Sequence, residues 1–568
     1  MYTQFKAKQE CYRILKKALG KTYPLSLDQL ISPPKPEFGD LSFPVFALAK
    51  GLGRNPAEIA TELAAKCGRG GLVASTKAIG PYLNFIYDNQ TLTEQVLAEV
   101  RRQKARYGKQ NTGAGKRVLI EYANLNTHKE VHLGHLRNLS YGLAMTNILA
   151  TNGYQVIPVS YINDLGANVA KCLWSIQKFY PDFIPAPTER LNFLGRAYTE
   201  ASQLLKADPT LQPEVSAIQK ALEDGTGPWW ELWKTTWQWS VDNLQEVFAD
   251  FGLTLDKVYF EHELIASAQT IVSRMLTEGI AVKSEGAVIV DLTAESAGIN
   301  LLRKTDNTLL YNAKDLALAY QKQEDYHPDR SFYVVDNRQS LALTQLFLTL
   351  RHLGFNQDLV HLSYDFVTLP EGAMSSRLGT IVRWTDLETE LLSDIKAKVA
   401  AHHPEWSPKK IVTTAKKLTL ASIKFFMLRQ TQAKPIVFDL SEATAYEGFS
   451  GPYVMYALVR ISSILTKSTL APESNPNLLV HPLEHSLIRI IAQFPDLVAA
   501  SALKADPSLL AHFAFTLAQQ FGRYYEEVPI IGDSNPTLEG ARLDLLRAIH
   551  ITLTNALQCL GIETIKQM

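Results

Sequence analysis

Cysteine is scarce in this sequence, and its cysteines are scattered. The four are Cys11, Cys67, Cys172 and Cys559. No Cys-x-x-Cys pair occurs, so we expect no structural zinc site and no other metal centre held by the protein's own side chains. This cysteine usage suits a reducing compartment.

Net charge and long apolar runs are absent as well. Lys and Arg number 57 and Asp and Glu also number 57, so bulk charge gives no sign of a nucleic-acid partner. No run of about 18 apolar residues occurs, and the polar N-terminus lacks the apolar segment of a signal peptide. We therefore expect a cytoplasmic protein with no membrane span.

The chain of 568 residues is too long for one ordinary domain, since domains usually hold about 100–200 residues. The predicted division is an N-terminal α+β domain over 1–112, a middle domain over 113–405 and a C-terminal all-α bundle over 406–568. Residues 175–255 of the middle domain have a helical pattern. They are rich in tryptophan, which more often serves packing than ligand stacking.

The middle domain begins with a strand–helix–strand pattern. Residues 118–123 form a short apolar run, a helical pattern ends at Asn152-Gly153, and 154–162 form a second strand. Further strands are predicted at 287–292, 308–311 and 331–336. Parallel strands joined by helices predict a doubly wound, nucleotide-binding sheet of the Rossmann type.

The sharpest chemical feature is His132-Leu133-Gly134-His135, which lies where the first strand leads into the helix. A helix N-terminus attracts phosphate, and Gly134 lets a ligand approach the backbone. Two imidazoles there can donate hydrogen bonds to a transferring phosphoryl group. The alternative is a pair of surface histidines beside a chance glycine.

These four residues match the HIGH signature of class I aminoacyl-tRNA synthetases. The longer string EYANLNTHKEVHLGHLRN resembles the arginyl-tRNA synthetase family in particular. That family has an Asn six residues before the first signature His, and often a Lys three residues before it. Asn126 and Lys129 occupy these positions.

The resemblance extends along most of the chain. YFEHELIAS, KTDNTLLYNAKD and YVVDNRQSLALTQLF are similar to family segments that hold the amino acid, which implies roles for Glu261, Tyr311, Asp315 and Gln339. A guanidinium has five donors and no acceptor, so its pocket needs carboxylates, here Glu261 and Asp315. Taken singly, Asp315 could cap a helix, Glu261 could be a surface charge, and Gln339 could end a strand.

Both terminal domains also resemble those of the family. GDLSFPVFALAKGLGRNPAEIA is similar to its extra N-terminal domain, which touches the tRNA elbow, and Asn84 is a weak candidate contact there. The C-terminal bundle looks like its anticodon-binding domain. Tyr453, Tyr456 and Arg460 share a helical face, where they either stack on unpaired bases or pack the bundle.

The chain departs from the family pattern in the loop that normally reads KMSKS. The matching residues are Ala373, Met374, Ser375, Ser376 and Arg377, so both signature lysines are missing. Lys129 or Arg377 is the expected substitute cation for the ATP phosphates. Two smaller departures are Ala342, where the family has a histidine, and Asn168, where it has a glutamine.

The resemblance implies an arginine–tRNA ligase. Its substrates would be L-arginine, ATP with bound Mg²⁺, and tRNA(Arg), with no editing domain and with tRNA needed for the first step; we expect a monomer. Three alternatives remain. They are a class I ligase for another amino acid, a non-catalytic tRNA-binding paralogue, and a small-molecule adenylyltransferase. The long helical C-terminal domain argues against the last, and the absence of a Cys/His set argues against a cysteine ligase.

Overall fold

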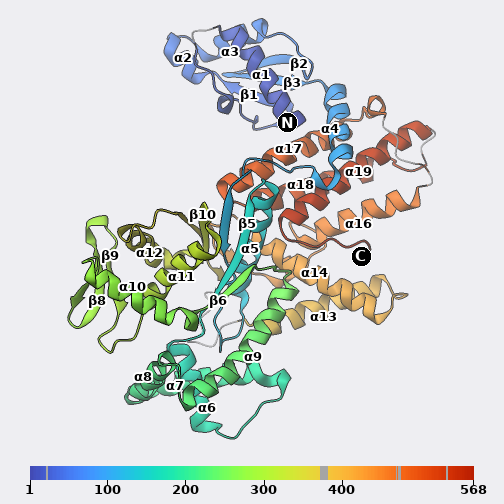
Figure 1. Cartoon of the computed structure of the whole chain (residues 1–568). Helices are drawn as coiled ribbons and strands as arrows, with labels where there is room; N and C mark the ends of the chain where they lie inside the picture. Colours follow the sequence, from blue (N-terminus) through green and yellow to red (C-terminus); the bar gives the residue numbers. More distant parts are fainter. Residues whose placement is uncertain (21–22, 371–381, 469, 471–474, 533–534) are drawn as a thin grey trace.

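The computed structural model describes the chain except residues 21–22, 371–381, 469, 471–474 and 533–534. Figure 1 shows an N-terminal domain at the top, a central sheet with helices on both faces, a helical insertion at the bottom and a helical C-terminal domain on the right. This arrangement confirms the predicted fold class.

The central sheet has five parallel strands in the order β11-β10-β4-β5-β6. They are β4 (Arg117–Glu121), β5 (Gln155–Ile162), β6 (Lys257–Phe260), β10 (Arg330–Asp336) and β11 (Asp358–Tyr364). The chain starts in the middle at β4, builds β5 and β6 on one side, and then returns to add β10 and β11 on the other. The strand order therefore reverses between β4 and β10, where doubly wound sheets bind ligands.

Two of the predicted strands do not belong to this sheet, so that part of the prediction is wrong. Residues 287–292 form β8 (Ala287–Leu292) of a separate antiparallel sheet with β7 (Val282–Ser284) and β9 (Gly298–Arg303). Glu285 and Gly286 both have positive φ, as a two-residue hairpin turn requires. Residues 308–311 are not a strand: Leu309 forms an isolated bridge, and α11 (Tyr311–Tyr326) starts at Tyr311.

The tryptophan-rich region is helical, as predicted. It contains α6 (Ala167–Phe179), α7 (Arg190–Ala207), α8 (Gln212–Glu223) and α9 (Pro228–Asp250). The indoles of Trp233 and Trp237 donate to the backbone oxygen and the carboxylate of Asp164, at 2.8 and 2.9 Å. The same carboxylate accepts the backbone N–H of His262 at 3.0 Å. These tryptophans therefore join α9 to the ends of β5 and β6.

Helix α5 (Leu133–Thr151) follows β4 and is buried along most of its length. The guanidinium of Arg137 is 2% exposed and donates only to backbone carbonyls, including those of Asp365 at 2.7 Å and Lys434 at 2.9 Å. The amide of Asn138 accepts from the N–H of Ala123 at 2.7 Å and donates to Val334 at 2.8 Å. Helix α5 is thus fixed to the sheet and to the C-terminal half of the chain.

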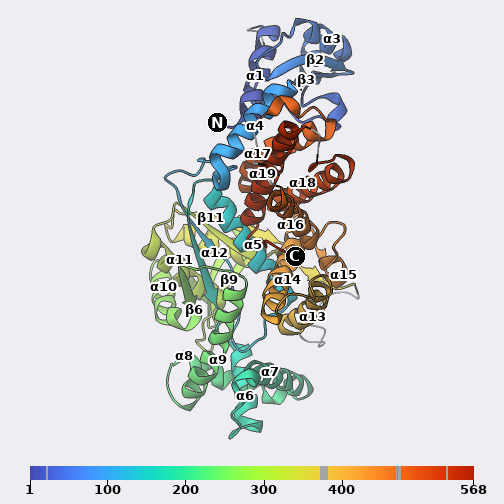
Figure 2. The same cartoon turned by 90° about the vertical axis from the view of Figure 1, so that its right-hand side faces the viewer.

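The C-terminal half is helical, with a short exception. Its main helices are α13 (Trp384–His402), α14 (Pro408–Leu428), α16 (Gly451–Lys467), α17 (Pro482–Lys504), α18 (Ser508–Glu527) and α19 (Pro536–Cys559). Strand β13 (Ile436–Val437) pairs with β12 (Val367–Thr368). Figure 2 shows α16, α17 and α19 stacked between the N-terminal domain and α13–α14.

Helix α17 is long and apolar enough to cross a membrane by composition alone, with a mean hydropathy of 1.4 in its most apolar window. It nevertheless contains Glu484, Arg489 and Asp496, and it packs against α18, α19 and α4. Glu484 is fully buried, and its carboxylate accepts from Arg542 at 3.0 Å. These features are those of a core helix in a helical domain.

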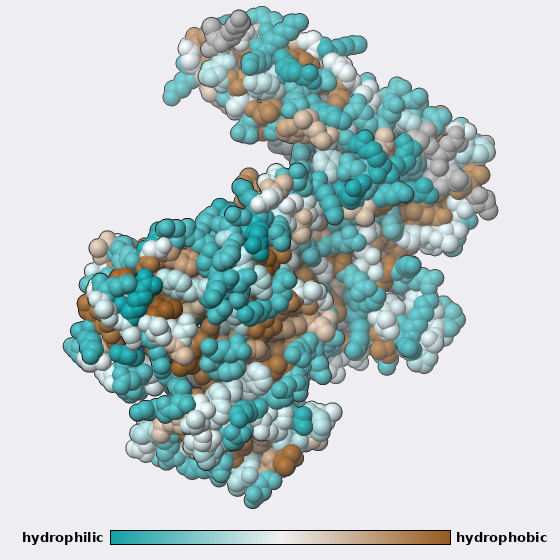
Figure 3. All heavy atoms as spheres, in the orientation of Figure 1, coloured by the Kyte–Doolittle hydropathy of each residue, from teal (hydrophilic) through white to brown (hydrophobic). Residues whose placement is uncertain are grey.

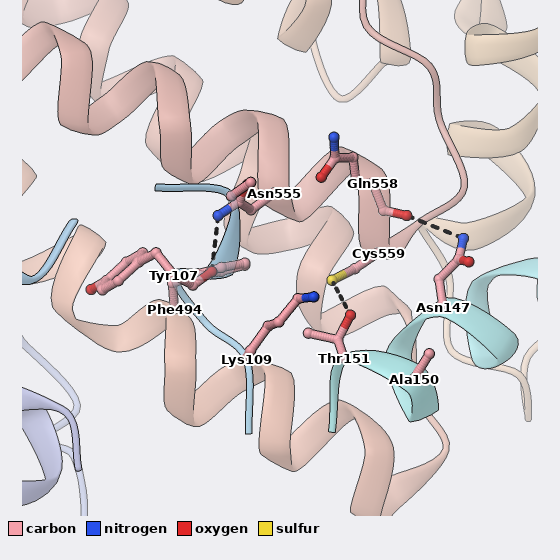
Figure 4. A pocket seen from close by; sticks show the side chains of 10 residues that line it. Tyr107, Lys109, Asn147, Ala150, Thr151, Phe494, Asn555, Gln558 and Cys559 are labelled. Atoms are coloured by element: carbon pink, nitrogen blue, oxygen red, sulfur yellow. Dashed lines mark hydrogen bonds between the residues drawn. The ribbon is translucent and has the colours of Figure 1, made fainter. Parts of the chain in front are cut away.

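The N-terminal domain packs three helices on a small antiparallel sheet of order β1-β3-β2. Its elements are α1 (Thr3–Leu19), β1 (Leu41–Pro44), α2 (Phe46–Leu52), α3 (Pro56–Lys66), β2 (Val73–Ile79) and β3 (Tyr82–Tyr87). Helix α4 (Asn89–Gln103) leads out of it toward the C-terminal domain. There Asn555 donates to the carbonyls of Lys104 and Tyr107 at 3.0 and 2.9 Å, beside a hollow of about 360 Å³ (Figure 4).

Candidate active site

A pocket of about 770 Å³ opens at the carboxyl ends of β4, β5 and β10, where the strand order reverses. Most of the catalytic and arginine-binding candidates line it, although they come from distant parts of the sequence. They are Asn126, Lys129, His132, Gly134, His135, Tyr311, Asp315 and Gln339. The structure therefore gathers the signature and most of the expected amino-acid-binding residues in one cavity.

The two signature histidines stand at the first turn of α5. His132 is the N-cap, and its backbone N–H donates to Nδ1 of His135 at 3.2 Å. The rings stack with centroids 3.6 Å apart, and the buried Nδ1 of His132 has no hydrogen-bond partner among the described residues. Burial lowers the pKa of His132 to about 4 and that of His135 well below its usual value. Neutral imidazoles therefore face the pocket beside the positive end of the helix.

Lys129 lies just before the signature, and its ammonium has no hydrogen-bond or ion-pair partner among the described residues. Burial lowers its pKa from the ordinary lysine value. A partly desolvated, unpaired cation interacts strongly with an anion that enters the same cavity. The backbone around it is held at the end of β5, because Thr127 N–H donates to the carbonyl of Asn163 at 3.1 Å.

The opposite end of the pocket is rich in buried and partly buried carboxylates. Glu121, at the end of β4, pairs with Lys322 at 2.5 Å, and Glu261 pairs with Lys314 at 2.6 Å. Asp315, on α11, has no ion-pair partner among the described residues. The half-buried Glu223 lies 3.8 Å from Lys314 as well. Acids thus outnumber lysines here, and the cluster is short of at least one positive charge.

Burial and, to a smaller extent, the nearby carboxylate of Glu121 together raise the pKa of Asp315 to about 7. Burial also raises the pKa of Tyr311 to about 12, so its hydroxyl remains a donor at neutral pH. A cation that approaches the carboxylate of Asp315 stabilises its charged form.

Glu261 is the one described residue of the expected arginine-binding set that does not line the pocket. It is fully buried, and its carboxylate also accepts from the backbone N–H of Leu165 at 3.4 Å. Its ion pair with Lys314 places it behind the cavity wall. The interpretation of Glu261 as a surface charge is wrong, because no part of it reaches solvent.

Four candidate residues, Met374, Ser375, Ser376 and Arg377, lie outside the described part of the chain. Their flanks are described. Phe366 and Val367 line the pocket on one side. On the other side, Leu133 N–H donates to Val382 at 3.0 Å, and Trp384 N–H donates to Val131 at 2.8 Å. The chain therefore leaves from, and returns to, positions beside the signature.

The candidate tRNA contacts are distant from this pocket. Asn84 is 1% exposed and makes side-chain hydrogen bonds within the N-terminal sheet, one of them with Ser42, so it offers no polar group to a partner. The prediction that Asn84 contacts tRNA conflicts with the burial of this side chain. Tyr453 packs on Phe515, whereas Tyr456 is 39% exposed.

Arg460 lies between two exposed tyrosines. Its guanidinium is 4.6 Å from the ring centre of Tyr456 and 4.7 Å from that of Tyr525 on α18. Sequence reasoning missed Tyr525, because it comes from another helix. It also missed Glu121, Asn138 and Arg338 at the main pocket. A carboxylate at the end of an apolar strand, as in Glu121, is a signal that could have been used.

Three family models match the chain. The model described as "tRNA synthetases class I (R), catalytic domain" covers residues 95–440. The model "DALR anticodon binding domain" covers 454–568, and "Arginyl tRNA synthetase N terminal domain" covers 9–87. The fold and the site thus define a class I aminoacyl-tRNA synthetase.

Comparison with individual relatives identifies the family within this class. An arginine–tRNA ligase of Bdellovibrio bacteriovorus is 37% identical over 98% of both chains, and one of Treponema denticola is 33% identical over 94% of both. The arginyl-tRNA synthetase of Thermus thermophilus has the same fold, with a TM-score of 0.81 and 25% identity over the full length of both chains. The chain belongs to the arginyl-tRNA synthetase family, and its activity is that of an arginine–tRNA ligase that uses ATP.

One buried and two partly buried imidazoles make stability depend on pH. His132, His135 and the neighbouring His128, whose pKa burial lowers to about 3, all stay neutral in the folded chain. The unfolded chain takes up these protons as pH falls through 6.5, so the free energy of unfolding drops by about 1.4 kcal/mol per imidazole at pH 5.5. We expect a lower Tm at pH 5.5 than at 7.5.

The matched variants are His135→Gln, which should reduce the difference in Tm between the two pH values, and His327→Gln at an exposed position, which should not. An equal pH dependence in His135→Gln and in the unmodified protein would contradict neutral burial of His135.

Proposed function

We propose that the pocket performs both steps of arginine–tRNA ligation, with arginine at its carboxylate-rich end and ATP at the start of α5. The carboxylate of arginine attacks the α-phosphate, which gives arginyl-adenylate and pyrophosphate. A ribose hydroxyl of the terminal adenosine of the tRNA then accepts the arginyl group, and AMP leaves. No side chain acts as a covalent nucleophile, so catalysis consists of positioning and charge stabilisation.

The excess of acids over lysines at this end of the pocket is the observation that carries this assignment of arginine. A guanidinium beside Asp315 supplies the missing positive charge, and Tyr311 lies on the same wall. Glu261 does not contact arginine in this proposal. Its ion pair with Lys314 holds the lysine ammonium away from the ligand. A neutral analogue such as citrulline leaves Asp315 unpaired, which is costly enough to exclude it without an editing step.

The positive end of the pocket suits the triphosphate. His132 and His135 present neutral donors at a helix N-terminus, and the ammonium of Lys129 has no ion-pair partner within the described part of the chain. Gly134 leaves room for a phosphate close to the backbone, and Gln339 and Asn126 can hold the α-amino and carboxylate groups of arginine. Mg²⁺ enters as the Mg·ATP complex and neutralises phosphate charge.

For tRNA, the exposed Tyr456, Arg460 and Tyr525 form a cluster that can stack on unpaired bases. Figure 3 shows the surface hollowed between the N-terminal and catalytic domains, a shape that fits a large partner. We further propose that the protein acts as a monomer, and that it acts in the cytoplasm, whose reducing conditions suit its four free cysteines.

Amino-acid-dependent exchange of pyrophosphate into ATP tests the assignment. We expect exchange with arginine alone among the amino acids, and only when tRNA is present. Exchange with a different amino acid would assign another substrate. Tight tRNA binding without any exchange would support a non-catalytic tRNA-binding protein instead.

Asp315→Asn should raise the KM for arginine about 100-fold or more, because loss of one buried charge-assisted pair costs about 3 kcal/mol. The KM for ATP should stay the same. The comparison variant is Asp325→Asn on the outer part of the same helix, where Asp325 pairs with Lys257 at 2.7 Å. An unchanged arginine KM in Asp315→Asn would place the guanidinium elsewhere.

Lys129→Ala should lower the rate of arginyl-adenylate formation by about 100-fold, the usual effect of removing one strong electrostatic contact to a transition state. Lys116→Ala, an exposed position at the start of β4, serves as the control. A near-normal rate in Lys129→Ala would transfer the phosphate role to Arg377.

A further inference from the structure

The residue before Lys129 is anchored in an unusual way. His128 is 1% exposed and has a φ of 57°, which is uncommon for a residue with a side chain. Its backbone N–H donates to Oγ of Ser240 at 3.0 Å. Its ring nitrogens lie 2.8 Å from Oγ1 of Thr236 and 3.0 Å from Oγ1 of Thr127. His128 therefore fixes the chain to α9 through both backbone and side chain.

The partners of Thr236 determine which ring nitrogen carries the proton. The hydroxyl of Thr236 donates to the carbonyl of Leu232 at 2.9 Å, so it must accept from Nε2–H of His128. Nδ1 then accepts from the hydroxyl of Thr127. Every polar atom of this buried imidazole is satisfied, and these bonds offset the cost of about 1–3 kcal/mol for the left-handed backbone.

Helix α9 is itself a rigid support. Trp233 and Trp237 bind it to Asp164, at the arginine end of the pocket. At its C-terminus, the buried ammonium of Lys424 donates to the carbonyls of Phe251 and Gly561 at 2.8 and 2.7 Å. A residue anchored to α9 is thus tied to elements that move only if the domain core moves.

The residues that flank His128 are also held by contacts with other parts of the chain. Asn126 forms a bridge with Asn163, and Glu130 pairs with Arg383 at 3.2 Å. Lys129 has no side-chain partner among the described residues. Its backbone direction is consequently set by its neighbours, and the nearest fixed point is His128.

We propose that His128 is a positioning residue, which aims the ammonium of Lys129 into the pocket by anchoring the signature segment on α9. This inference rests on the proposed role of Lys129 in ATP activation. His128 touches no substrate itself. Its contribution is geometric, and a displacement of about 1 Å at a catalytic group can cost about 100-fold in rate.

A double-mutant cycle tests the proposal, with single-turnover formation of arginyl-adenylate in the presence of tRNA as the measurement. We expect His128→Ala to reduce the rate about 10- to 100-fold and to leave the arginine KM unchanged. In a Lys129→Ala background, the same change should reduce the rate less than 3-fold, because the group that His128 positions is gone. Equal losses in both backgrounds would overturn the proposal.

A milder variant keeps the test valid if His128→Ala fails to fold. Thr236→Val preserves shape and removes the acceptor for Nε2–H, and it should show the same dependence on Lys129. Thr235→Val, at the exposed neighbouring position of α9, is the control and should have no effect. His128→Asn should restore part of the rate, because asparagine tolerates the left-handed conformation.

The outcomes separate this proposal from the proposed function. Absence of arginine-dependent exchange in the unmodified protein would contradict the function itself. Normal exchange with an undiminished rate in Lys129→Ala would contradict the role of Lys129, and with it the positioning role. Suppose that Lys129→Ala lowers the rate of arginyl-adenylate formation as expected, while neither His128→Ala nor Thr236→Val changes it. This result would overturn only the inference about His128.

Discussion

An excess of carboxylates over ammonium groups at one end of the pocket is the constraint on which this site depends. Glu121 and Glu261 are each neutralised by a lysine of α11, whereas Asp315 on the same helix has no ion-pair partner among the described residues. Tyr311, Asp315, Leu318 and Lys322 recur at helical spacing, so one face of α11 meets the ends of β4 and β6. Burying a charge is costly unless it is paired, and in the proposed function the ligand supplies the missing partner of Asp315.

Two helices convert this arrangement into a two-ended pocket. Helix α5 starts at the signature and is locked to the sheet through Asn138, while Arg137 ties it to the chain on both sides of residues 371–381. Helix α9 joins Asp164, near the proposed arginine end, to His128, near the proposed phosphate end. In the proposed function, rigid elements of the protein therefore set the distance between the two substrates.

The sequence predicted the strand–helix–strand unit at 118–162 because its apolar runs are short and its helix has a clear stop at Asn152-Gly153. It also predicted eight of the residues that line the pocket, since Asn126, His132 and Asp315 lie in ordered motifs. The sequence predicts the strand at 287–292 as part of the parallel sheet, and this is wrong because a buried run does not reveal the direction of its neighbours. The turn at Glu285-Gly286 was the missed signal.

Long-range pairing explains the other differences. Nothing near Glu261 in the sequence indicates that Lys314 covers it, and nothing near Arg460 indicates that Tyr525 of another helix joins its cluster. His128 was overlooked for the same reason, since its partners lie more than a hundred residues away on α9. Local patterns identify residue types that suit a chemistry, but only the folded chain shows which charges are already paired.

Calorimetry of arginine binding, in two buffers of different ionisation enthalpy, tests the central claim most directly. Because burial raises the pKa of Asp315 to about 7, about half of the molecules carry its proton at pH 7, and a guanidinium should expel it. The account predicts release of about half a proton per arginine at pH 7, and loss of this release in Asp315→Asn. Binding heats that are identical in both buffers at pH 7 would contradict it.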